Sequence, residues 1–481
     1  MQRMMWVTTV WLLVAGASGA FGQNRASQYD LVILHGRVMD PESGLDAVRH
    51  VGIRAGKIEA LATELLRGRT VIDARGLVVT PGFVDLHQHS HNQESDRTKV
   101  LDGVTSALDM EGGAGDVDRW YADRAGKALV NYGAAVGHTR LRSVVVSGGP
   151  AKFPTGEAAT RNLSPAELEK LKTLVDQGMR RGAPGVGLSL GDTPGATPWE
   201  VLEMFRLAAR YPGAPVHVHV RNTKESEYWL ETEEVLAAAL ISGAPLHIAH
   251  ANSSYSSDVG RLFEIIDAAR QRGLDVTTEC YPYTAGMHPI EAALYDGWES
   301  WTDEQFQSFE WPATGERLTR QSFGRYRREG GLVVSHGVPE EAVRQAIASP
   351  LTMIASDGVL ENGIGHPRNA GTYARVLGRY SRQEGLLSLM DALRKMTLMP
   401  AQRLERRVPA MKDKGRLRVG ADADITVFDP NRITDRATYR DPSTPSTGIQ
   451  FVIINGSVVV ANGRIREGVA PGRPIRAPVT N

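Results

Sequence analysis

Short apolar runs alternate with longer amphipathic stretches through the middle of the 481-residue chain. Apolar runs that are bounded by Gly and Pro are typical of buried parallel strands, and the stretches between them carry apolar residues at helical spacing. One such stretch, 164–182, begins with Ser164 and Pro165, which favour a helix start, and ends at Gly182. The predicted strands span residues 78–87, 103–111, 132–138, 183–191, 214–221, 244–251, 274–283 and 350–358.

Eight strand–helix units in series predict an α/β fold with a closed (β/α)8, TIM-like barrel. We place this barrel at residues 79–410. An irregular segment rich in Trp, Phe and Arg, at about 288–335, interrupts the pattern before the last strand. We expect it to be an insertion over the barrel mouth.

Both ends of the chain predict small β-elements. "LVILHGRVMD" (31–40) and "FVIINGSVVV" (451–460) each place His-Gly or Asn-Gly between two apolar runs, which predicts a β-hairpin. A further strand is predicted within 415–430. The simplest arrangement is a small β-sandwich lobe that is built from residues 23–78 and 411–481.

Residues 1–22 predict a secretory signal peptide, because Arg3 precedes an apolar stretch from about Met4 to Ala17 and small residues follow it. The stretch is shorter than the roughly 20 residues of a membrane span, although an uncleaved anchor is the alternative. Cys280 is the only cysteine, so no intramolecular disulfide can form. We therefore expect a periplasmic or secreted protein with no stable membrane insertion after removal of the signal.

Composition narrows the choice of partners. The hydrophobic content of 42% and the charged content of 23% are typical of a soluble globular protein. Lys and Arg (55) balance Asp and Glu (55), which argues against nucleic acid or an anionic membrane as the main partner. We expect a small-molecule substrate, and the sequence carries no signal for an oligomeric state.

Imidazole and carboxylate side chains gather at the predicted strand ends. His87 and His89 lie two positions apart and therefore point to the same face of their strand. In a (β/α)8 barrel the carboxyl ends of the strands meet at one face, where the active site lies. Imidazoles and carboxylates are also the ligands that Zn²⁺ binds. The predicted metal site therefore consists of His87, His89, Glu111, His219, His250 and Asp357.

Several of these residues have a simpler alternative. The histidine-rich end of the first strand could be a solvated loop, and a lone strand histidine is often only a packed, hydrogen-bonded residue. Asp357 precedes a glycine and could simply begin a turn. Asp109 shares a face with Glu111 and is the alternative ligand from the second strand.

Three further histidines are not expected to be ligands. His91 lies past the end of its strand. His217 shares a face with His219 but lies one layer deeper, where it would pack or support a ligand. His247 lies three positions before His250 and should face the opposite way.

Longer motifs resemble the metal-dependent amidohydrolase superfamily and, within it, the D-aminoacylase (N-acyl-D-amino-acid deacylase) group. The superfamily pattern is "PGFVDLHQH", one histidine on each of strands five and six, and "SDG" on strand eight. The closer likeness lies in "HVHVRN", "ECYPYTAG", "HPRNAGTYARVLGRY", "RKMTLMPAQRL" and "KGRLRVGADADITVFDP". The resemblance covers about residues 30–465. It implies a barrel with a terminal β-lobe and one or two Zn²⁺ ions at the barrel mouth.

The resemblance also implies roles for the metal ligands. His219 and His250 would hold the tighter zinc. His87 and His89, with Asp357, would face a second, weaker metal position. Many relatives bridge the two positions with a modified lysine on strand four, but "GLSLGD" has none. D-aminoacylases use a cysteine after strand two, where this chain reads "DMEGG". We expect Glu111 to bridge instead.

Substrate-binding residues follow from the same resemblance. Arg368 and Tyr283 match residues that hold the substrate carboxylate, and an Arg fork suits a carboxylate. The alternative for Arg368 is a surface salt bridge. Asn252 stands where the family usually has a lysine near the substrate, so we expect it to contact a different or more weakly held anion.

The predicted function is zinc-dependent hydrolysis of a linear amide C–N bond, which releases a carboxylate and a free amino acid from an N-acyl, D-configured amino acid. Asp357 would take a proton from water and pass it to the leaving nitrogen. One alternative is an amidohydrolase that acts on cyclic amides or dipeptides, like a hydantoinase or dihydroorotase. The other is a non-catalytic exported metal-binding barrel, against which Asp357 argues, because metal binding alone needs no general base.

Overall fold

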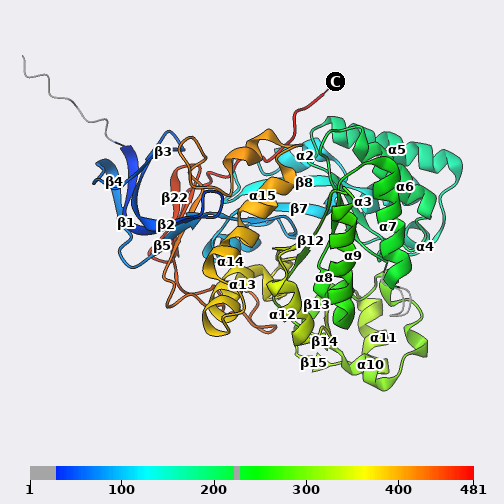
Figure 1. The fold of residues 1–481 in the computed structure, drawn as a ribbon. Helices are drawn as coiled ribbons and strands as arrows, with labels where there is room; N and C mark the ends of the chain where they lie inside the picture. The colour runs from blue at the N-terminus through cyan, green and yellow to red at the C-terminus, as the bar shows by residue number, and fades with distance from the viewer. Residues whose placement is uncertain (1–28, 222–227, 481) are drawn as a thin grey trace, which may run out of the picture.

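The computed structural model describes residues 29–221 and 228–480. The predicted signal peptide, 1–22, lies outside the described residues. Figure 1 shows a barrel surrounded by helices, with a smaller β-lobe at its left side. Within the described ranges, no helix has the length and apolar character that a membrane crossing requires.

Eight parallel strands form the barrel and follow one another in chain order. They are β6 (Phe83–Asp85), β7 (Val104–Ala114), β8 (Asn131–Gly137), β9 (Val186–Ser189), β10 (Val216–His219), β11 (Leu246–Ile248), β12 (Val276–Cys280) and β17 (Thr352–Ile354). A bridge between Gln88 and Gly358 continues the first strand alongside the last. The predicted (β/α)8 barrel is therefore confirmed.

A buried polar cluster closes the seam between β6 and β17. Asp85 Oδ1 accepts the backbone N–H of Ser356 at 3.0 Å, and Asp85 Oδ2 accepts Lys99 Nζ at 2.7 Å. Both charged side chains are fully buried. The bond from Ser356 joins the ends of the first and last strands, and Lys99 of α1 pairs the buried charge of Asp85, which would otherwise be costly.

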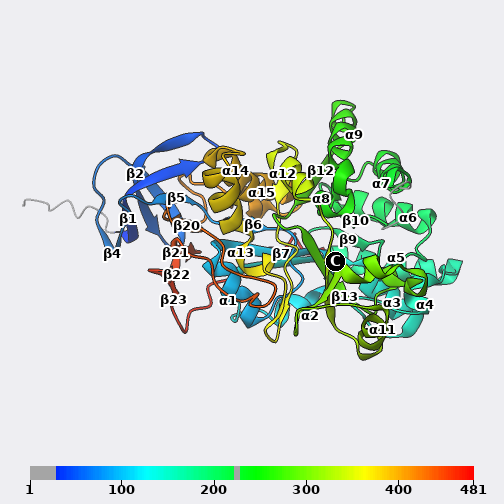
Figure 2. The ribbon, with the colours of Figure 1, turned by 90° about the horizontal axis from the view of Figure 1, so that it is seen from below.

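Helices cover the outside of the barrel (Figures 1 and 2). Those that precede the insertion are α1 (Gln93–Leu101), α2 (Val117–Ala122), α3 (His138–Ser147), α4 (Glu157–Thr160), α5 (Pro165–Arg180), α6 (Pro198–Ala209), α7 (Tyr228–Ser242), α8 (Ala251–Ser254) and α9 (Val259–Gln271). Those that follow it are α12 (Glu340–Ala348), α13 (Arg368–Arg375), α14 (Leu389–Met396) and α15 (Leu398–Leu404). Ser164 caps α5 in a capping box with Glu167, as its position before Pro165 predicts.

The lobe is a nine-stranded sheet that both ends of the chain build. Its strands are β1 (Tyr29–Asp40), β2 (Leu45–Arg54), β3 (Lys57–Ala62), β4 (Gly68–Asp73), β5 (Val78–Pro81), β20 (Ile425–Phe428), β21 (Ile449–Ile454), β22 (Ser457–Ala461) and β23 (Arg464–Ile465). β5 joins the two contributions, because it pairs with β1 on one side and β20 on the other.

The run at 78–87 therefore divides between the lobe (β5) and the barrel (β6). Gly82 lies between the two strands, where an added Cβ would come within 2.2 Å of the Thr105 side chain. The chain changes sheets at a residue that only glycine fits.

Only one of the two predicted hairpins forms. Asn455 and Gly456 join β21 to β22, and both have the positive φ, 49° and 80°, that a tight hairpin turn requires. The hairpin predicted at 31–40 is wrong, because β1 runs straight through it. There only His35 has a positive φ, 64°, and the register of pairing with β2 shifts between Ile33 and Gly36, so the chain makes a bulge.

The insertion forms a sheet of its own between β12 and β17 in the chain. It contains β13 (Ala285–Pro289), α10 (Asp303–Gln307), β14 (Phe309–Trp311), β15 (Glu316–Arg317), α11 (Arg320–Glu329) and β16 (Leu332–His336). Its aromatic residues pack on one another, as in the stacked pair Trp301 and Phe309 at 5.4 Å between ring centroids. β13 and β16 both contribute to the cavity described next.

Candidate metal centre

The six predicted ligand side chains meet at the carboxyl end of the barrel strands. The donor atoms of five of them form two groups, in each of which every atom lies within 4.8 Å of the others. The groups are His87, His89 and Glu111, and Glu111, His219 and His250. Because Glu111 belongs to both groups, its carboxylate is placed to bridge two metal positions.

The distances show how closely the donors approach. Glu111 Oε2 lies 2.7 Å from His87 Nε2, and His87 Nε2 lies 3.1 Å from His89 Nε2. On the other side, Glu111 Oε1 lies 3.4 Å from His219 Nδ1, and Oε2 lies 3.5 Å from His250 Nε2. These side chains are at most 11% exposed, so they surround a space that bulk water barely reaches.

Asp357 stands beside the first group. Its Oδ1 lies 3.2 Å from His89 Nε2 and 3.4 Å from His87 Nε2, while Oδ2 accepts Arg368 Nη2 at 2.8 Å. The backbone of Asp357 has a φ of 50°, and that of His250 a φ of 30°. Asp357 lies outside the assigned helices, strands and turns, and its carboxylate points toward the histidines.

The electrostatics of the site favour a cation. Burial alone would lower the pKa of His219, but the hydrogen bond and charge of Glu111 raise it to about 9. Burial alone would raise the pKa of Glu111, but His87 and the neighbouring histidines hold it well below its usual range. The carboxylates thus remain ionised and stabilise positive charge among the imidazoles. A divalent cation matches this donor set of imidazole nitrogens and carboxylate oxygens.

Glu111, and not Asp109, belongs to the donor groups on the second strand. Asp109 Oδ1 accepts the backbone N–H of Gly113 at 2.9 Å and lies 3.7 Å from His89 Nδ1. It belongs to neither donor group. Glu111 Oε2, by contrast, is buried and has no hydrogen-bond donor among the described residues, which fits an oxygen that binds a metal.

A cavity of about 370 Å³ opens onto His219 and His250 of the second donor group. His219, His250 and Asp357 line its floor, and Met287, His288 and Tyr295 of the insertion line its wall. Arg368 also lines this space, which we call the metal cavity, and is only 2% exposed. Its Nε and Nη1 are buried without a hydrogen-bond partner among the described residues. The surface salt bridge considered for Arg368 is therefore wrong, since its guanidinium is buried and faces the cavity.

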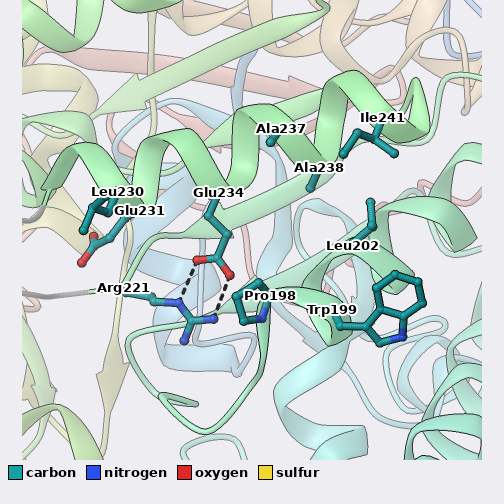
Figure 3. Close-up of a pocket in the computed structure, with 10 residues that line it drawn as sticks. All are labelled: Pro198, Trp199, Leu202, Arg221, Leu230, Glu231, Glu234, Ala237, Ala238 and Ile241. Carbon is teal, nitrogen blue, oxygen red and sulfur yellow. Dashed lines mark hydrogen bonds and ion pairs between the residues drawn. The ribbon is translucent and has the colours of Figure 1, made fainter.

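A different cavity, of about 500 Å³, lies between α6 and α7 on the outside of the barrel (Figure 3). Trp199, Leu202 and Ile241 are among its apolar lining residues. Arg221 and Glu234 are paired there through two contacts of 2.8 and 2.9 Å. Because this cavity contains neither donor group, the candidate active site is the metal cavity.

Comparison with known proteins agrees with this choice. The sequence model of the amidohydrolase family matches residues 70–460. The chain belongs to the amidohydrolase family. Two curated relatives from Alcaligenes xylosoxydans xylosoxydans, an N-acyl-D-glutamate deacylase and a D-aminoacylase, are each 29% identical to it. The alignments cover 93% and 91% of this chain and 96% of each relative.

Solved structures share the fold of this amidohydrolase. The N-acyl-D-glutamate deacylase of Bordetella bronchiseptica, complexed with zinc and a phosphonate inhibitor that mimics the tetrahedral intermediate, has a TM-score of 0.78. It is 25% identical, and the match covers 94% of this chain and all of that chain. A D-aminoacylase structure has a TM-score of 0.79 at 25% identity over 93% of this chain and all of its own. A D-hydantoinase, with a TM-score of 0.61 at 18% identity, shares the fold alone.

Glu279 of the amidohydrolase supports the metal centre, and sequence reasoning missed it. Its Oε1 lies 2.5 Å from His87 Nδ1, and its Oε2 lies 3.1 Å from His247 Nε2. A carboxylate in this position holds the proton on Nδ1 of His87 and leaves Nε2 for the metal side. The sequence offered no signal for Glu279, because its partners His87 and His247 come from other strands of the barrel.

The remaining histidines lie as follows. His217 stacks on His247 at 4.3 Å between ring centroids, one layer below the ligands, as its position predicts. The expectation that His247 faces away is wrong, because β11 ends at Ile248 and His250 is no longer in a strand. His91 bonds to the Gln88 carbonyl at 3.1 Å and belongs to neither donor group.

Two predicted substrate contacts need correction. The Tyr283 hydroxyl faces the Pro367 carbonyl at 3.4 Å, and its ring packs on Arg375, outside the lining of the metal cavity. Tyr281 lines the cavity in its place, with Arg368 4.5 Å from its ring centroid. Asn252 is fully buried, and both of its polar groups bond to the Tyr281 backbone, at 3.1 and 3.3 Å. Asn252 therefore holds Tyr281 and does not reach the cavity.

Proposed function

We propose that this amidohydrolase is an N-acyl-D-amino-acid deacylase, which hydrolyses a linear amide and releases a carboxylate and a free amino acid. The observation that carries the proposal is the position of Arg368. Arg368 shares a cavity with Asp357, His219 and His250, and two nitrogens of its buried guanidinium have no hydrogen-bond partner among the described residues. This arrangement suits a substrate that carries a carboxylate next to the scissile amide. The deacylase relatives support this substrate class and the D-configuration.

We assign the metal to residues whose donors fit a zinc ion. His219, His250 and Glu111 would hold one ion, and His87, His89 and Glu111, with Asp357 beside them, would hold a second. Zinc supplies Lewis acidity, which polarises a carbonyl group and makes water more acidic. The zinc-bound deacylase structure supports this choice of metal.

Asp357 acts as the proton carrier. Burial alone would raise its pKa, but Arg368 and the histidines hold that pKa far below its usual range, so the carboxylate is ionised and can accept a proton. It takes a proton from the attacking water and delivers it to the leaving nitrogen. Arg368 holds the substrate carboxylate, and its bond to Asp357 keeps the amide nitrogen close to the proton carrier.

The direct test is an assay of the purified, zinc-loaded protein. It uses N-acetyl-D-amino acids, their L-enantiomers, a hydantoin and dihydroorotate. The proposal expects release of free D-amino acid, and expects a chelator to remove this activity and added zinc to restore it. Turnover of the cyclic amides alone would contradict it. Bound metal with no turnover of any amide would favour the non-catalytic alternative.

Replacement of Arg368 by Met is expected to raise KM for N-acetyl-D-amino acids by about 10–100-fold, because a charge-assisted hydrogen bond to the carboxylate is lost. Michaelis–Menten analysis separates this rise from any change in kcat. Arg379→Met is the matched control, since Arg379 pairs with Glu340 and Glu384 away from the cavity. An unchanged KM in Arg368→Met would show that Arg368 does not bind the substrate carboxylate.

We also propose that the protein is exported to the periplasm or secreted. The support is the order of Arg3, an apolar stretch and small residues within positions 1–22. Expression of the full chain, followed by N-terminal sequencing of the periplasmic fraction, tests this. Recovery of the uncleaved chain with the membranes would favour an anchor.

A further inference from the structure

A second cavity, of about 660 Å³, lies beside the metal ligand His89. Arg124, Arg140 and Lys152 line it, and we call this space the basic cavity. The proposed reaction uses none of these three residues. Cationic side chains gathered in a concave site raise the local concentration of anions.

The two arginines are not neutralised by neighbours. Arg140 Nε donates to the Gly113 carbonyl at 2.8 Å, and Arg124 Nη1 donates to the Trp120 carbonyl at 2.7 Å. The Arg124 guanidinium also lies 3.8 Å from the Trp120 ring centroid, and its Nε is buried without a partner among the described residues. Neither guanidinium has a carboxylate of the described residues within ion-pair distance.

The two carboxylates that line the basic cavity differ in their partners, since only Glu361 lies within ion-pair distance of a cavity cation. Glu94 accepts the backbone N–H of Gly363 at 3.0 and 3.2 Å. Glu361 is 55% exposed, accepts Ser90 Oγ at 3.3 Å and lies 3.8 Å from Lys152 Nζ. Three cationic side chains and two carboxylates thus line the basic cavity.

Lys152 connects the basic cavity to the metal centre. Its Nζ donates to the backbone carbonyl of His89 at 3.2 Å. The next residue, Phe153, contacts the rings of both His89 and His288, with centroids at 6.3 and 4.9 Å. One loop thus borders both cavities.

We propose that the basic cavity is an anion subsite of the active site, which binds a carboxylate of the substrate other than the one that Arg368 holds. This inference rests on the proposed deacylase function. The second carboxylate has two sources, a dicarboxylic acyl group or an acidic amino-acid side chain. Both present the same planar anion to an Arg fork and a Lys ammonium.

Five substrates separate the sources. N-acetyl-D-leucine has one carboxylate, N-acetyl-D-glutamate adds a second in the side chain, and N-succinyl-D-leucine adds a second in the acyl group. In N-acetyl-D-glutamine and N-succinamoyl-D-leucine, the corresponding monoanions, an uncharged amide replaces the second carboxylate. We expect kcat/KM for one of the two dianionic substrates to exceed that of its amide counterpart by about tenfold or more, since a charge-assisted hydrogen bond is worth at least this factor. The preferred substrate identifies the source.

The variants test which residues cause the preference. The measured ratio is kcat/KM for the preferred dianionic substrate divided by kcat/KM for its amide counterpart. We expect Lys152→Met and Arg124→Gln each to lower this ratio about tenfold. Lys152→Arg should keep it, because the charge remains. Lys127→Met is the matched control, since Lys127 is an exposed lysine outside the cavity. A ratio near one in the wild type, or a ratio that both variants leave unchanged, overturns the anion subsite while hydrolysis of N-acetyl-D-leucine upholds the deacylase. Absence of hydrolysis of all five substrates overturns both.

Discussion

Replacement of Asp357 by Asn is expected to lower kcat for N-acetyl-D-amino acids by about 10²–10⁴-fold, the range that general acid–base catalysis supplies. Asn keeps the size of the side chain and can still accept a hydrogen bond from Arg368 Nη2, which lies 2.8 Å from Oδ2 in the wild type. It cannot accept the proton from water. The loss should therefore appear in kcat, and KM should change much less.

Metal content is the control for this variant. His219, His250 and Glu111 form a group that does not include Asp357, so at least one zinc per chain is expected to remain by elemental analysis. Full turnover in Asp357→Asn would remove the proton-carrier role. Loss of all zinc would show that Asp357 acts mainly as a ligand.

Replacement of Glu111 by Gln is expected to weaken zinc binding by more than the roughly 10–100-fold that the loss of an outer-shell partner causes. Glu111 belongs to both donor groups, so one substitution removes a charged oxygen from each. Activity should fall with the metal content, and high zinc concentrations should restore part of it. Competition with a calibrated chelator measures the affinity.

Asp109→Asn is the matched control for Glu111→Gln. Asp109 lies two positions earlier on β7, is also buried, and bonds to the backbone of Gly113. It should lose little zinc affinity. Equal losses of zinc affinity in both variants would indicate that Asp109 is also a ligand. An unchanged zinc affinity in Glu111→Gln would exclude Glu111 as a bridging carboxylate.

The sequence was informative wherever regular strands determine the geometry. His87, His89, Glu111, His219, His250 and Asp357 converge because the carboxyl ends of parallel barrel strands must meet at one face. The alternation of side chains is a property of the strand, so it identified the shared face of the two histidines at the end of β6. Assigning the two histidines to one face required no information about contacts between distant residues.

The errors came from extending the same rule past the strand ends. β12 ends at Cys280, so Tyr283 no longer follows its alternation, and β11 ends before His250. Asn252 was assigned by motif position, yet its environment depends on the loop that carries Tyr281. The role of Glu279 arises only when β12 lies beside β11, which is a tertiary contact. The insertion forms part of the wall of the metal cavity. Its shape depends on packing among its own aromatic residues, which the sequence pattern did not predict.

The two-part construction of the lobe affects how the protein folds during synthesis and how proteases can cleave it. β5 leaves the ribosome early, but its partner β20 becomes available only when synthesis has passed Phe428. Until then one edge of β5 offers unpaired backbone groups to any neighbouring chain, and such long-range pairings form slowly. No single proteolytic cut can separate the two folding units, because the lobe holds the barrel at both of its ends.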